Sequence, residues 1–127
     1  MGQFKIIYEG IRTYNLKDAG YSSFDDAARD IKKVLGLAAA LVQLCIVAQD
    51  NIKTRLANYE THSVYDDINQ GKAQRKMHDL DTKIKKWSEK ISYINSRNFS
   101  EYDILKPLIK ELEVEIKQVK KLKAIYV

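Results

Sequence analysis

The stretch VLGLAAALVQLCIVA, residues 34–48, determines how the rest of this sequence is interpreted. It contains no charged residue and no proline, and its apolar side chains recur at alternating spacings of three and four. That spacing is typical of a helix that packs against other helices at a shallow crossing angle. A second apolar stripe lies beside the first, so the helix is apolar nearly all round and needs cover on more than one side.

The spacing extends well beyond this stretch and predicts one long helix over residues 23–60. Ser23 is a good N-cap, and Asp25 and Asp26 then fall in the first turn, where carboxylates favour the positive end of the helix dipole. Gln49 is the one polar interruption in a stripe that covers more than four heptads. The stripe consists of Ile31, Leu35, Ala38, Val42, Cys45, Gln49, Ile52, Leu56 and Tyr59.

Three environments would cover so apolar a helix. The leading interpretation is burial against several helices in an oligomer or complex, and the alternatives are an ordinary internal core and contact with a membrane. The stretch has 15 residues, fewer than the roughly 20 that span a bilayer. The predicted surface for self-assembly or a partner is Val34, Leu35, Leu37, Leu41, Val42, Leu44, Cys45, Ile52 and Leu56.

The 3-4 pattern is lost in residues 60–72, where Gly71 could break the helix, and then resumes. It predicts a second helix over residues 65–95, whose opposite face is rich in lysine and carboxylates. Trp87 lies on its apolar stripe, where a tryptophan indicates core. The predicted coiled-coil seam is Met77, Leu80, Ile84, Trp87, Ile91 and Ile94.

The segment INSRNFSEYD, residues 94–103, is the clearest turn in the chain because it is rich in residues that favour caps and turns. A third helix is predicted over residues 103–125, with Asp103 as its cap and Pro107 in the first turn. Residues 1–22, with Gly10 and Gly20, predict an irregular or partly disordered arm. The predicted fold is therefore all-α, with residues 23–127 forming an antiparallel coiled-coil hairpin or a three-helix bundle.

The bulk composition supports one domain and gives little indication of a target. The chain has 127 residues and a formal net charge of +5, but its 22 basic residues are interleaved with 17 acidic ones. This pattern favours solvated helix faces, with an anionic partner as the alternative, and no nucleic acid is expected. The N-terminus shows neither a signal peptide nor a membrane span. The expected location is cytoplasmic before export, or secreted by a leaderless route.

No set of residues indicates catalysis, a metal site or a cofactor. There are two histidines and one cysteine, none with zinc spacing, and no phosphate-binding glycine loop. Arg55 and His62 resemble the Arg…His motif of HEPN-type RNases, which implies RNA cleavage. Leu56 stands where those enzymes usually have a polar residue, so we expect a non-enzyme and keep the RNase as a third hypothesis.

The order of segments in residues 34–98 suggests a family. An apolar helix ending in Ala-Gln-Asp precedes a Gln-containing segment, INQGKAQRKMHDLDTKI, and a second helix ends EKISYINSRN. This order resembles the EspA/SseB-like filament and translocator proteins of type III secretion systems. The resemblance implies a secreted virulence protein that polymerises through a coiled coil and is held by an export chaperone. The chain is shorter than those proteins, and only SRNFSEYD separates the turn from the last helix.

The leading functional hypothesis is a non-catalytic helical assembly protein that self-associates or pairs with another helical protein. A subunit related to secretion filaments or translocators fits this hypothesis. The alternative is a small helical chaperone or binding module that forms a heteromer with one unlike partner.

Overall fold

The structure is a computed structural model that describes residues 16–57 and 64–126, with side chains described from Gly71 onward in the second range. Three long helices make up most of it: α2 (Phe24–Ala57), α3 (Val64–Ile94) and α4 (Leu105–Ile125), the last preceded by the 3₁₀ turn η1 (Tyr102–Ile104). No strand occurs in these two ranges. The prediction of an all-α fold is confirmed.

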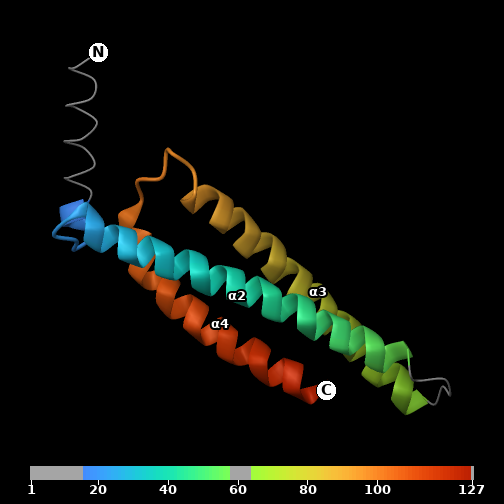
Figure 1. The fold of residues 1–127 in the computed structure, drawn as a ribbon. Helices are drawn as coiled ribbons and strands as arrows, with labels where there is room; N and C mark the ends of the chain where they lie inside the picture. Colours follow the sequence, from blue (N-terminus) through green and yellow to red (C-terminus); the bar gives the residue numbers. More distant parts are fainter. Residues whose placement is uncertain (1–15, 58–63, 127) are drawn as a thin grey trace.

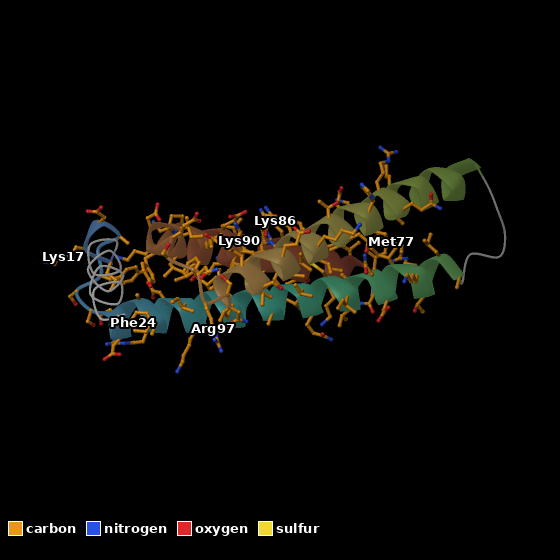
Figure 2. The ribbon with its side chains drawn as sticks, turned by 90° about the horizontal axis from the view of Figure 1, so that it is seen from above. Lys17, Phe24, Met77, Lys86, Lys90 and Arg97 are labelled. Carbon is orange, nitrogen blue, oxygen red and sulfur yellow. The ribbon has the colours of Figure 1, made fainter. Side chains whose placement is uncertain are left out.

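The three helices form a bundle in which α2 and α4 run in the same direction and α3 runs in the opposite one (Figure 1). Helix α2 packs along both of the others, whereas the backbones of α3 and α4 rarely come close. In Figure 1 α2 lies in front of its neighbours, and in Figure 2, turned by 90°, it lies along one edge of the molecule. One side of α2 therefore faces the bundle and the other faces away from it.

The start of α2 follows the predicted capping pattern. The Ser23 hydroxyl accepts a hydrogen bond from the backbone N–H of Asp26 at 3.3 Å. Asp25 and Asp26 lie in the first turn, where their charges interact favourably with the helix dipole. The predicted N-cap is confirmed.

The final part of the predicted irregular arm is packed against the bundle. Residues 16–18 are helical, Gly20 adopts a φ of 86°, and Leu16 and Tyr21 are buried. The Tyr21 hydroxyl donates to Asp30 Oδ2 at 2.6 Å, and the Lys106 ammonium lies 4.9 Å from the centre of the Tyr21 ring. These contacts tie the segment from Leu16 to Tyr21 to α2 and α4. Residues 1–15 lie outside the described part of the chain.

The sequence predicted a loss of the helical pattern over residues 60–72 and a turn over residues 94–103. Residues 58–63 lie outside the described ranges, but Gly71 does not break α3, which runs through it. The turn after α3 is where the sequence placed it, and Phe99 packs there edge-on between the rings of Tyr93 and Tyr102 at 5.5 and 5.7 Å.

The predicted start of the third helix is wrong in one respect. Asp103 lies in η1, and α4 begins after Ile104 without a side-chain cap. The η1 turn continues directly into α4, so no free helix end is left at Asp103 for a cap. Pro107 lies in the first turn of α4, where its missing N–H has no intrahelical acceptor to satisfy.

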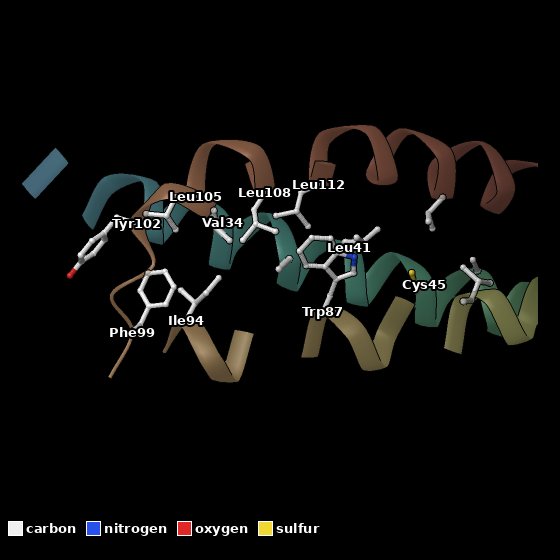
Figure 3. Close-up of a cluster of buried hydrophobic side chains, with 14 of the residues drawn as sticks. Val34, Leu41, Cys45, Trp87, Ile94, Phe99, Tyr102, Leu105, Leu108 and Leu112 are labelled. Atoms are coloured by element: carbon white, nitrogen blue, oxygen red, sulfur yellow. The ribbon is translucent and has the colours of Figure 1, made fainter. Parts of the chain in front are cut away.

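The core runs along the line where the three helices meet (Figure 3). Trp87 from α3 projects toward Leu41 of α2 and Leu112 of α4, and all three are completely or almost completely buried. The predicted core position of Trp87 is confirmed.

Candidate functional site: the two faces of helix α2

The nine residues predicted to form a partner surface lie in or against the core of the chain itself. Val34, Leu41, Cys45 and Ile52 are completely buried. The other five are partly buried and pack against that core: Leu35, Leu37, Val42, Leu44 and Leu56. Helices α3 and α4 thus supply much of the cover that the sequence led us to expect from other chains. Partner contact through the partly buried residues stays a prediction.

The predicted coiled-coil seam of α3 faces inward along its whole length. Leu80, Trp87 and Ile94 are buried, and Met77, Ile84 and Ile91 are partly buried against the core. Because buried and partly buried positions alternate at spacings of three and four, one side of the stripe lies deeper than the other.

Gln49, the polar interruption in the apolar stripe, fixes the register between α2 and α3. Its side-chain amide donates to the backbone oxygen of Met77 at 3.2 Å and to Asp81 Oδ1 at 2.6 Å. Leu35 and Val42 precede Gln49 at intervals of seven residues, so this stripe lies on the α3 side of α2. A single polar residue in an apolar seam often specifies register in this way.

Trp87 and Glu115 form the polar centre of the contact between α3 and α4. The indole N–H of Trp87 donates to Glu115 Oε2 at 2.5 Å, and the Lys83 ammonium lies 3.0 Å from Glu115 Oε1. A second ion pair joins Lys86 to Glu111 at 2.5 Å, on the side of α3 away from α2 (Figure 2). The carboxylate of Glu115 satisfies a buried indole donor and so has a structural role.

Cys45 is a free cysteine that is completely buried in the core, where its thiol is unreactive. Burial in apolar surroundings raises the pKa of its thiol to about 11, and the nearby Lys83 ammonium offsets this only in part. Since the thiolate is the reactive form, such a thiol is inert at neutral pH.

The outer face of α2 differs from an ordinary solvent-facing helix surface. A stripe at 3-4 spacing runs along it, flanked by Lys32 at one end and Asp50 at the other, and all of its residues are exposed. Between these two charges the stripe consists of Gly36, Ala39, Gln43 and Ile46. We call these six residues the outer stripe. Ile46 is 39% exposed. A solvated helix face normally carries charges throughout, whereas this one carries none across four consecutive positions.

The composition of α2 raises the question of a membrane. By length and hydropathy it is the one helix among the described residues that could cross a bilayer, and 28% of its most apolar window is buried inside the bundle. A core helix passes the same test, and the uncharged run from Val34 to Gln49 has 16 residues, fewer than the roughly 20 that span a bilayer. Leu41 and Cys45 contribute to this hydropathy and are completely buried in the bundle, but most of the window is not.

Arg55, one half of the RNase-like motif, is engaged within the bundle. Its guanidinium donates to the backbone oxygen of Ile125 at 2.8 Å and lies 5.7 Å from the centre of the Tyr126 ring. It lines a hollow of about 250 Å³ at the end of the bundle. His62 lies outside the described residues, so the pairing that the RNase hypothesis requires stays a prediction.

Further hollows lie on the described part of the bundle. One of about 280 Å³ lies between α3 and α4 and is lined by lysines, Asp79 and apolar side chains. Within residues 16–57 and 64–126, no group of three His, Cys, Asp or Glu side chains is arranged to hold a metal.

Comparisons with known proteins add no relative. No family model, no curated protein and no solved structure matches this chain.

The sequence contains a signal for the outer stripe. Residues 32, 36, 39, 43, 46 and 50 keep the same alternating 3-4 spacing as the two core stripes. Lys32, Gln43 and Asp50 are charged or polar, Gly36 and Ala39 are small, and Ile46 is the one large apolar residue among them. The buried residues of α2 are all apolar, whereas the outer stripe mixes polar, small and apolar residues.

Proposed function

We propose that this protein is a non-catalytic assembly subunit that binds another helix through the outer face of α2. The observation that carries the proposal is the outer stripe, where Gly36, Ala39, Gln43 and Ile46 are exposed and uncharged. Covering an exposed, uncharged helix face with another apolar surface is favourable, because it removes apolar area from water. Small side chains also let a second helix approach closely.

The proposed setting is a secretion apparatus, with this chain as a filament- or translocator-like subunit. Support comes from the resemblance of residues 34–98 to EspA/SseB-like proteins, together with the antiparallel packing of α2 and α3 in that region. The partner can be a second copy or an unlike helical protein such as an export chaperone. Both would use the same face of α2.

A matched pair of variants tests the use of this face in the source cells. Ile46→Glu places a charge in the outer stripe, and Val114→Glu places one on α4, where Val114 is 55% exposed. We expect the parent and Val114→Glu to migrate in native extracts well above the 14.7 kDa of one chain. Ile46→Glu should migrate as the free chain. Circular dichroism of both purified variants checks that the fold is intact.

Two results would overturn the proposal. One is a parent protein that migrates as a free chain in native extracts at every concentration. The other is an Ile46→Glu variant that keeps the same complex as the parent.

A further inference from the structure

In charge and in size, each residue of the outer stripe complements the one equally far beyond Leu41 along the helix. Lys32 and Asp50 lie nine positions before and after Leu41, Gly36 and Ile46 five positions, and Ala39 and Gln43 two positions. Each pair combines opposites: a cation with an anion, the smallest residue with the largest apolar one, and an apolar residue with a polar one. Such a pattern is what a helix needs in order to pack against an antiparallel copy of itself.

We propose that the partner at the outer face of α2 is a second copy of this chain, packed antiparallel about a two-fold axis that crosses this face at the level of Leu41. This inference rests on the proposed function and names its partner. In a two-fold interface each residue faces the one equally far beyond the axis. Lys32 then faces the partner's Asp50 and Gly36 faces the partner's Ile46. By symmetry each of these contacts occurs twice.

Charge complementarity argues for the antiparallel arrangement. Among the described residues neither Lys32 nor Asp50 belongs to an ion pair, so both are available to a partner. In a parallel pair Lys32 would face the partner's Lys32 and Asp50 the partner's Asp50, both repulsive. The antiparallel arrangement replaces these two repulsions with two attractions.

Side-chain size argues for the same arrangement. A Cβ built onto Gly36 meets nothing within 4 Å, so no contact within the chain requires glycine there. Glycine weakens a helix relative to alanine. Opposite the partner's Ile46, however, it leaves the space that this side chain fills. A parallel pair would instead place two glycines together and leave that space empty.

The charged residues next to the outer stripe limit the length of the proposed contact between the two copies. One layer beyond Lys32 and Asp50, Arg29 would face the partner's Lys53, and two cations would meet. Arg29 is also engaged by Asp26 at 3.0 Å. The contact between the two copies therefore ends at Lys32 and Asp50. These residues are roughly 27 Å apart along a helix with a rise of 1.5 Å per residue.

Charge reversal in the purified full-length chain tests the pairing. Lys32→Glu and Asp50→Lys should each weaken dimerisation roughly ten- to thirty-fold in sedimentation equilibrium, since each creates two like-charge contacts. The double variant should recover affinity to within about three-fold of the parent. Glu113→Lys, an exposed reversal on α4, is the control and should leave affinity unchanged.

Spin labels on single introduced cysteines test the direction. In an antiparallel pair centred on Leu41, the two copies of a label at Gln43 are separated by roughly 6 Å along the helix axis, and those of a label at Lys53 by roughly 36 Å. In a parallel pair both labels would give the same short distance. The native Cys45 is buried, and the parent protein treated with label supplies the background.

The outcomes separate this inference from the proposed function. Weakening by both single reversals, recovery in the double variant and a long Lys53 distance would support the antiparallel dimer. Equal short distances for Gln43 and Lys53, or single reversals without effect, would overturn it. A purified chain that stays monomeric, while Ile46→Glu abolishes a complex in native extracts, would overturn the second copy and leave the proposed function standing with an unlike partner.

Discussion

The two faces of α2 are both poor in charge, yet only one of them is covered. The inner face presents Val34, Leu41 and Ile52, which are completely buried between α3 and α4. The outer face presents Gly36, Ala39 and Ile46 to solvent. Leu41 and Ile52, the largest of the buried residues of α2, lie on the inner face, and Ile46 is the one large apolar residue of the outer stripe.

This difference shows that hydropathy alone cannot assign a face to an apolar helix. Burial of a large apolar side chain stabilises the fold more than burial of a small one, because it removes more apolar area from water. The stabilisation is about 25 cal/mol per Å². Helices α3 and α4 cover one side of α2, and its completely buried Leu41 and Ile52 lie on that side. Small residues left outside keep the exposed apolar area low and also permit a close approach by another helix.

The largest expected effect comes from truncating the inner face. Leu41→Ala removes a completely buried side chain next to Trp87 and should lower the free energy of unfolding by about 2–5 kcal/mol. Ile46→Ala, the matched change on the outer face, should alter it by less than about 0.5 kcal/mol. Urea denaturation followed by circular dichroism, at concentrations where the chain is monomeric, measures both. Equal losses at the two positions would remove the distinction between the faces.

A smaller effect is expected from Cys45 at alkaline pH. Its thiol pKa is raised from 9.0 to about 11 in the folded chain, so between these values the unfolded chain loses the proton first. The buried neutral thiol therefore contributes fully to the free energy of unfolding below pH 9. This contribution is lost as the pH rises toward 11. The loss should be about 2–3 kcal/mol, at roughly 1.4 kcal/mol per pH unit.

Comparison with a second variant isolates this effect from other groups that titrate in the same range. Cys45→Ala keeps every tyrosine and lysine but has no thiol, so its stability should fall less steeply from pH 9 to 11. Parallel slopes for the parent and Cys45→Ala in denaturation experiments at stepped pH would contradict the proposed burial effect.

The sequence predicted the helices well because their signals are local. Ser23 and the two aspartates after it mark the start of α2, and the 3-4 spacing carries the inner stripes of α2 and α3. The prediction that Asp103 caps the third helix was wrong, because capping depends on where the preceding turn lets the helix begin. Here η1 leads directly into α4.

The candidate site was harder to predict because it depends on which helices are neighbours. The partner surface was expected at Leu41 and Cys45, and the structure places both in the core of the chain itself. Spacing shows which residues share a stripe, but only the packing of α3 and α4 shows which stripe is left uncovered. The contact between Trp87 and Glu115 joins residues 28 positions apart, and no local sequence pattern predicts it.

The smallest expected effect, and the sharpest test of the outer face, comes from Gly36. Gly36→Ala should raise the free energy of unfolding of the monomer by about 0.5–1 kcal/mol, because alanine is the better helix former and nothing lies near the added Cβ. Gly71→Ala is the matched control, because Gly71 also lies inside a helix with no atom within 4 Å of an added Cβ. Urea denaturation should show the same gain for both. If Gly36 provides space for the partner's Ile46, only the change at Gly36 should also weaken association in sedimentation equilibrium. Association unchanged in both variants would mean that Gly36 is not needed for close approach, and the size argument for the antiparallel pair would fail.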